Sequence, residues 1–111
     1  FLEVIQVQDA KAFIEWAALE REQHRLLALE TLLQLIHNHE TNGQIEKAIP
    51  LAQQLVTIEP HHEGWHRRLI NLFLQTGQRQ QAQAQFEACR QIMQEMFHQD
   101  VSAATQALLS M

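Results

Sequence analysis

Apolar residues recur every three or four positions along most of the chain, which is the spacing of an amphipathic helix. Residues 10–41 contain neither glycine nor proline. Phe13, Trp16, Ala17 and Leu19 form one apolar stripe there, and Leu26, Leu29, Leu33 and Ile36 form a second. So many apolar positions around one helix predict burial against neighbours on two sides, with Phe13 and Trp16 in the core. We expect one long helix, or two nearly continuous ones, capped by Asp9 and preceded by an extended segment at residues 1–8.

The same spacing predicts four further helices, at residues 44–58, 62–75, 79–97 and 102–109. Gly43, Pro60 and Gly77 separate the first three from their neighbours, because glycine and proline end helices readily. Pro50 lies inside the first of them, so we expect either a kink or a later start to that helix.

Two small residues repeat at a spacing of 34 positions: Gly43 is followed by Gly77, and Ala48 by Ala82. This is the period of the tetratricopeptide unit, a pair of antiparallel helices. The glycine supplies a left-handed residue at the end of the first helix, and the alanine lets the two helices approach closely. The predicted fold is therefore all-α: a tetratricopeptide-like array of antiparallel helix pairs with residues 102–109 as a C-terminal capping helix.

Composition and net charge indicate a folded domain and argue against a nucleic-acid-binding surface or a membrane span. Of the 111 residues, 46% are apolar and 19% are charged, as in a single folded domain over residues 1–111. The net charge of −5 argues against binding a phosphate backbone over a broad surface. Cys89 is the one cysteine, which favours a reducing cytoplasm, and no apolar stretch approaches the roughly 20 residues of a membrane span. Because the chain begins at Phe1, we expect it to be a fragment of a longer protein.

The string His62-Glu63-Gly64-Trp65-His66 fits the H-E-x-x-H pattern of zinc peptidases, in which two histidines bind zinc and the glutamate is a general base. It starts only two residues after Pro60 and contains a glycine, whereas the peptidase motif lies inside a long helix. We therefore expect no enzymatic activity, no cofactor and no metal. A zinc hydrolase that uses these residues is kept as an alternative. Cys89 lies on an apolar stripe and is expected to be a core residue.

One polar pair suggests a binding groove. Arg67 and Asn71 are four residues apart, and superposing the two repeats aligns them with Leu33 and His37. In tetratricopeptide arrays this face lines a concave groove, where a cation and an amide can hold a peptide carboxylate or backbone. These four residues form the predicted partner-binding groove. The alternative is an ordinary pair of surface residues.

The order of several segments resembles the bacterial transcriptional activator domain of antibiotic-regulatory-type proteins. The matching positions are Phe1-Leu2, Asp9, Phe13, Trp16, Glu20-Arg21-Glu22, Gly43, Ala48, Pro60, Glu63, His66-Arg67, Leu69, Gly77, Arg79, Ala82 and Phe86-Glu87-x-Cys89-Arg90. The chain departs from the family after Gln94, where a Leu-Gly-x-x-Pro turn is usual and residues 96–100 read Met-Phe-His-Gln-Asp.

The resemblance implies a regulatory domain that does not itself recognise DNA. In such proteins a winged-helix domain binds DNA, and the helical domain is thought to mediate self-association and contacts with the transcription machinery. The partners implied are therefore proteins or other domains of the parent chain, with DNA reached only through a winged-helix domain outside this sequence, and no membrane. The alternative is a stand-alone tetratricopeptide-type scaffold that binds peptides.

Overall fold

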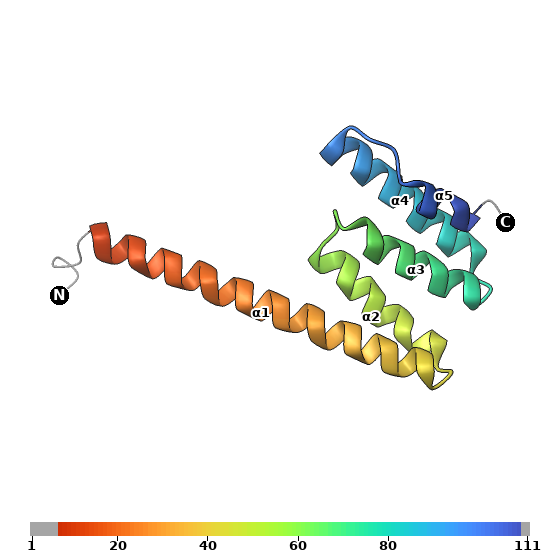
Figure 1. The fold of residues 1–111 in the computed structure, drawn as a ribbon, viewed down its shortest axis with the longest axis horizontal. Coiled ribbons are helices and arrows are strands. Elements are labelled where there is room, and N and C mark those ends of the chain that lie inside the picture. Colours follow the sequence, from red (N-terminus) through yellow and green to blue (C-terminus); the bar gives the residue numbers. More distant parts are fainter. Residues whose placement is uncertain (1–6, 110–111) are drawn as a thin grey trace.

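The computed structural model describes residues 7–109, and all of their regular structure is helical (Figure 1). The helices are α1 (Val7–Thr41), α2 (Ile45–Ile58), α3 (Glu63–Gln75), α4 (Arg79–Phe97) and α5 (Ala103–Leu109). The all-α prediction is confirmed. Residues 1–6 of the expected extended segment lie outside the described residues, whereas residues 7–8 are helical. Asp9 therefore lies in the first turn of α1 and is not its cap.

The helices pack in chain order as two antiparallel pairs. α1 packs on α2 and α3 packs on α4, while α2 and α3 join the pairs and α5 lies against α3 (Figure 1). α5 is the predicted C-terminal helix, and it contacts the array through α3. None of the helices within residues 7–109 is both long and apolar enough to cross a bilayer.

Both helix pairs turn through the same hydrogen-bonded motif. Gly43 and Gly77 have φ of 73° and 75°, in the left-handed region. The N–H of the following residue donates to a carbonyl five residues back, Gln44 to His39 and Gln78 to Phe73, each at 2.8 Å. This pattern satisfies carbonyls that a helix end leaves without partners. The repeat of 34 residues seen in the sequence is therefore a repeat of backbone conformation.

The core lies where the paired helices approach most closely. Ala48, Ala52 and Ala82 are 0% exposed, as are Ile36 and Leu55 around them. The small side chain of alanine at these positions allows the backbones of the paired helices to pack closely, as the sequence predicted.

α2 passes through Pro50 without ending, so the expectation of a later start is wrong. Pro50 and Glu46 are both exposed. Water can therefore reach the Glu46 carbonyl that the proline leaves without its helical partner.

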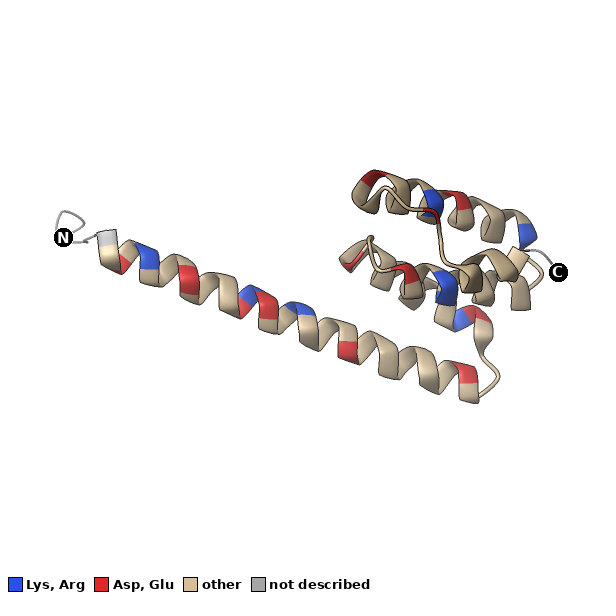
Figure 2. Cartoon of the chain, turned by 45° about the horizontal axis from the view of Figure 1, so that its top comes forward, with Lys and Arg blue, Asp and Glu red and all other residues tan. Residues whose placement is uncertain are grey.

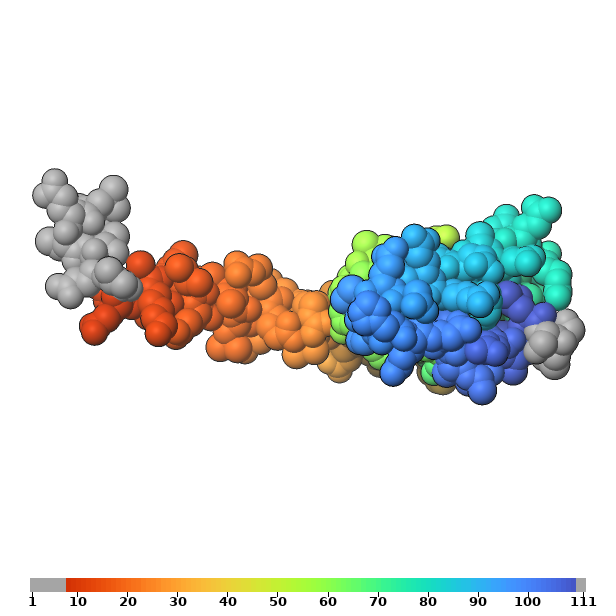
Figure 3. Space-filling view, turned by 90° about the horizontal axis from the view of Figure 1, so that it is seen from above, coloured from red at the N-terminus to blue at the C-terminus, as the bar shows by residue number. Residues whose placement is uncertain are grey.

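The N-terminal part of α1 projects away from the array (Figures 1 and 3). The described chain measures 64 × 37 × 18 Å with a radius of gyration of 18.8 Å, against about 13 Å for a compact domain of this size. Burial on two sides is therefore wrong for α1, where only the face carrying Leu29, Leu32 and Ile36 is buried. Phe13 and Trp16, expected in the core, are 66% and 57% exposed because no other helix of residues 7–109 covers them.

Ala48→Leu tests the close approach of α1 and α2. Three extra carbons at a site with no exposed surface must push the helices apart, and we expect a loss of about 1–3 kcal/mol in the free energy of unfolding. The measurement is equilibrium denaturation with guanidinium, monitored by circular dichroism. Ala84→Leu on the exposed face of α4 is the matched control and should change stability little. Equal stability of both variants would place the helix contact elsewhere.

Candidate functional site

Two of the four predicted groove residues line a common hollow. Arg67 and Asn71 border a shallow space of about 390 Å³ between α3 and α5. Its other lining residues are Gly64, Trp65, Arg68, Ala104 and Leu108. Leu33 and His37 on α1 do not line it: Leu33 packs against the core, and His37 is exposed. α5 supplies the wall opposite Arg67, and the sequence comparison of the two repeats did not anticipate this.

Both arginines of the hollow carry an ion pair. Arg67 Nη1 lies 3.2 Å from Glu63 Oε2, and Arg68 Nη2 lies 2.8 Å from Glu40 Oε1. The Arg68 Nε is buried and has no hydrogen-bond partner among the described residues. The side chain of Arg67 is 40% exposed, and its bond to Glu63 uses one of five N–H donors. Arg67 can therefore donate to a bound carboxylate without leaving Glu63.

Glu63 fastens the wall of this hollow. Its carboxylate accepts hydrogen bonds from the Ser102 N–H at 3.1 Å and from the hydroxyls of Ser102 and Thr105 at the start of α5. Burial would raise the pKa of Glu63, but these hydrogen bonds, with Arg67 nearby, hold the pKa below its ordinary value. Glu63 thus acts as an anchor between α3 and α5, and the H-E-x-x-H pattern gave no signal of that role.

The two histidines of the H-E-x-x-H pattern, His62 and His66, contact different groups. His66 is 0% exposed, with Nε2 2.6 Å from the Pro60 carbonyl and Nδ1 2.8 Å from the Gln85 amide nitrogen. A carbonyl can only accept, so Nε2 carries the proton and Nδ1 accepts from Gln85. The ring of His62 stacks on Trp65 at 4.1 Å. Residues 7–109 hold no cluster of three or more metal-ligating side chains.

Cys89 is fully buried beside Met93 and Val101, as expected of a core residue. Burial raises the pKa of its thiol to about 11. Almost none of it is therefore thiolate at neutral pH, and the thiolate is the reactive form.

A second half-buried carboxylate, Glu59, lies at the point where α1 leaves the array. Glu59 accepts from Arg25 Nη1 at 2.6 Å and from Trp65 Nε1 at 2.8 Å. The hydrogen bond from Trp65, together with Arg25, lowers the pKa of Glu59 against the opposing effect of burial. Glu59 therefore joins α1, the end of α2, and α3 at one place. N-terminal to Arg25, α1 projects away from the other helices (Figure 1).

Exposed apolar side chains lie along one side of α1, from its projecting part to just past Arg25. At about 100° per residue, five large apolar side chains fall within an arc of about 140°. These residues, which we call the outer seam, are Phe13, Trp16, Leu19, Leu26 and Leu27. They are 51–66% exposed. The apolar stripes of the sequence include Phe13, Trp16, Leu19 and Leu26, but their pattern predicted burial. Their exposure makes the outer seam a candidate interaction surface.

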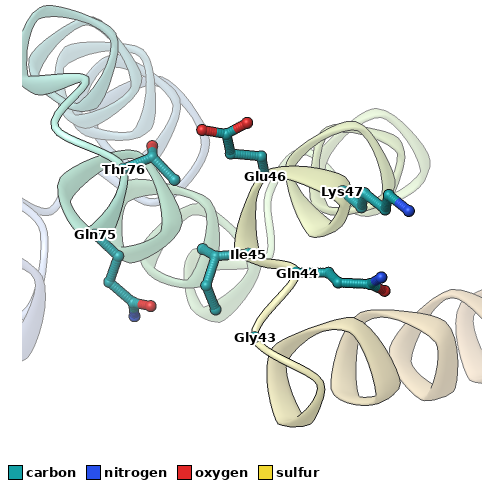
Figure 4. Close-up of a pocket in the computed structure, with 7 residues that line it drawn as sticks. All are labelled: Gly43, Gln44, Ile45, Glu46, Lys47, Gln75 and Thr76. Atoms are coloured by element: carbon teal, nitrogen blue, oxygen red, sulfur yellow. The ribbon is translucent and has the colours of Figure 1, made fainter.

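The turns of the two repeats enclose a further hollow of about 360 Å³, between the start of α2 and the end of α3 (Figure 4). Its charged side chains, Glu46 and Lys47, point away from each other, and Gln44 and Gln75 point in different directions (Figure 4). Because the polar groups do not converge on one point, this hollow is not a candidate ligand site.

Comparison with protein families gives a match to the family described as bacterial transcriptional activator domain, over residues 5–110. Neither the curated proteins nor the solved structures contain a match to the chain.

Acid should destabilise the fold through His66. Burial lowers the pKa of His66 below its ordinary value of 6.5, against the opposing effects of the Pro60 carbonyl and Glu63. As the pH falls, His66 is protonated in the unfolded chain before it is protonated in the folded chain. The stability that neutral His66 contributes is therefore complete above about pH 6.5 and is lost as the pH falls toward the folded-state pKa. We expect the Tm to fall between about pH 7 and pH 5.

The matched variants are His66→Gln and His61→Gln, since His61 is exposed. The fall in Tm should be smaller in the first and unchanged in the second. A parallel fall in all three proteins would assign the acid sensitivity to other groups.

Proposed function

Since the chain belongs to the bacterial transcriptional activator domain family, we propose that it is the protein-interaction domain of a transcription activator in the bacterial cytoplasm. In this role it mediates self-association or contacts with the transcription machinery and leaves DNA recognition to another domain. The single observation that carries the proposal is the outer seam of α1. Its large apolar side chains would be more stable out of water, and no other helix of residues 7–109 packs on them.

The energetics of the outer seam support this role. Covering one large apolar side chain contributes about 1.5–3 kcal/mol, and five such side chains are more than half exposed. Several large apolar side chains exposed on one side of a helix are typical of interaction sites. A single projecting helix is also marginal in water unless its apolar face is packed. Binding a partner would therefore stabilise both the seam and the helix that carries it.

The charge distribution supports leaving DNA to another domain. The net charge is −5, and the adjacent arginines Arg67 and Arg68 are both paired with glutamates. A surface that binds duplex DNA needs several basic side chains directed at phosphates. Along α1, acidic positions continue to the end of the helix, whereas lysine and arginine positions stop before its last third (Figure 2).

A stand-alone peptide-binding scaffold is the second candidate, and the hollow between α3 and α5 favours it. Arg67 offers exposed donors there, Asn71 is exposed beside it, and Ala104 and Leu108 give an apolar wall. A short segment ending in a carboxylate has the matching chemistry, because guanidinium binds carboxylate strongly. This candidate needs no role for the outer seam, so separate variants distinguish the two.

Trp16→Glu combined with Leu19→Glu tests the outer seam. Two new charges on an apolar surface oppose its burial, and we expect the loss of whichever interaction the wild-type chain shows. Sedimentation velocity measures self-association, and biolayer interferometry measures binding to immobilised bacterial RNA polymerase holoenzyme. Ala18→Glu, on another face of α1, is the control. Binding that survives the double substitution would remove the seam from the interaction.

Arg67→Gln and Ala104→Trp test the hollow. Losing the guanidinium should weaken binding of a peptide with a free acidic C-terminus by about tenfold or more, since a charged hydrogen bond contributes about 1.5–3 kcal/mol. Ala104→Trp should block the hollow sterically, whereas Ala103→Trp, which does not line it, should not. Fluorescence anisotropy with a labelled peptide gives the affinities. Equal affinities for all three variants and wild type would exclude peptide binding at this place.

A further inference from the structure

The charged residues of α1 are divided between two sides of the helix. At about 100° per residue, the half that carries the outer seam contains carboxylates and neither lysine nor arginine. The glutamates on that half are Glu15, Glu20 and Glu30. The basic residues on the opposite half are Lys11, Arg21 and Arg25. By the same geometry, Glu20 and Glu30 fall within the arc of the outer seam and Glu15 lies at its edge. The outer seam is therefore an apolar stripe that also carries negative charge.

These three glutamates are exposed or partly exposed and can contact a partner. The ion pairs found within residues 7–109 use Glu22, Glu59, Glu63, Glu40 and Asp100 as their acidic members. Glu15, Glu20 and Glu30 take part in none of them. On the opposite half, Arg25 is already held by Glu22 and Glu59. A charge facing the seam from outside would therefore meet glutamates that are in none of these ion pairs.

We propose that the outer seam binds an amphipathic helix of a partner protein whose apolar stripe is flanked by lysine and arginine. This inference rests on the proposed function and names the chemistry of the partner. Residues 13–27 extend over about 21 Å of helix axis, and Leu19 and Leu26 lie seven residues apart. Apolar residues at that spacing pack against another helix, as in a coiled coil. The glutamates of this half of α1 select a basic partner.

A second copy of the chain fits the seam less well. Both copies would bring the same glutamates, so in an antiparallel pair centred on Glu20 that residue would face its own counterpart. In a parallel pair Glu30 would face Glu30, and like charges at such positions are unfavourable. A basic helix replaces each of these repulsions with an attraction.

The available area sets the expected strength. Side chains of this size have full areas of about 150–250 Å², so exposures of 51–66% leave on the order of 500 Å² on the seam. With the matching face of the partner, the interface buries about 1,000 Å², at the lower limit of specific interfaces. We expect a reversible, micromolar interaction whose selectivity comes from charge.

Two synthetic peptides and the full chain test this inference. Both peptides carry three heptads with leucine at the a and d positions; one has lysine at e and g, and the other has glutamate. Isothermal titration calorimetry should show at least about tenfold tighter binding of the lysine peptide at low salt, with the difference shrinking as salt screens the charges. Glu15→Lys, Glu20→Lys and Glu30→Lys together should reverse the preference, and Leu19→Glu should abolish binding of both peptides.

Equal affinity for the two peptides, or a preference for the glutamate peptide, would overturn the inference. Sedimentation of the chain alone as a dimer, made monomeric by Leu19→Glu, would assign the seam to a second copy instead. Either result leaves the proposed function standing, since a protein still covers the seam. Failure of both peptides to bind overturns the inference as well. The proposed function itself fails only when self-association and binding to RNA polymerase holoenzyme are also absent.

Discussion

The close approach of paired helices at alanine is the constraint on which the rest of this structure depends. Ala48 and Ala82 lie with no exposed surface between antiparallel helices, and each follows a left-handed glycine by five residues. The glycine turn sets where the second helix starts, and the alanine sets how near it lies. Once α2 and α3 are placed in this way, Glu59 and Glu63 come within reach of groups on α1 and α5. The small residues therefore determine where the charged ones act.

The sequence predicted the parts of the fold that depend on local chemistry. Helix ends at Gly43 and Gly77, the close contact at Ala48 and the bounds of α4 all follow from conformational preference and spacing. Exposure of the outer seam could not be predicted in that way, because the period of apolar residues identifies a face and does not show what covers it. Phe13 and Trp16 have the pattern of core residues, yet they lie beyond the reach of α2.

The candidate sites show the same limit. Arg67 and Asn71 share a hollow as the spacing suggested, but Leu33 and His37 are absent from it because α5, not α1, forms the opposite wall. That wall depends on Glu63, which accepts hydrogen bonds from residues about 40 positions along the chain. In the H-E-x-x-H string the same glutamate has the appearance of a general base. The same residue types at the same spacing can thus form a catalytic motif in one protein and structural contacts in another. The neighbouring groups in the folded structure decide between these two roles.

The Glu59 anchor divides α1 into a part packed on the array and a part that projects from it. Arg25 and Glu59 fix the helix where it leaves the array, so its direction is set by the folded domain. Beyond that point the helix gains nothing from the array and retains exposed apolar side chains. Because α1 is fixed at Arg25, the outer seam is presented in one orientation. This lowers the conformational entropy that is lost when a partner binds. The array therefore contributes to recognition mainly by fixing the helix that a partner contacts.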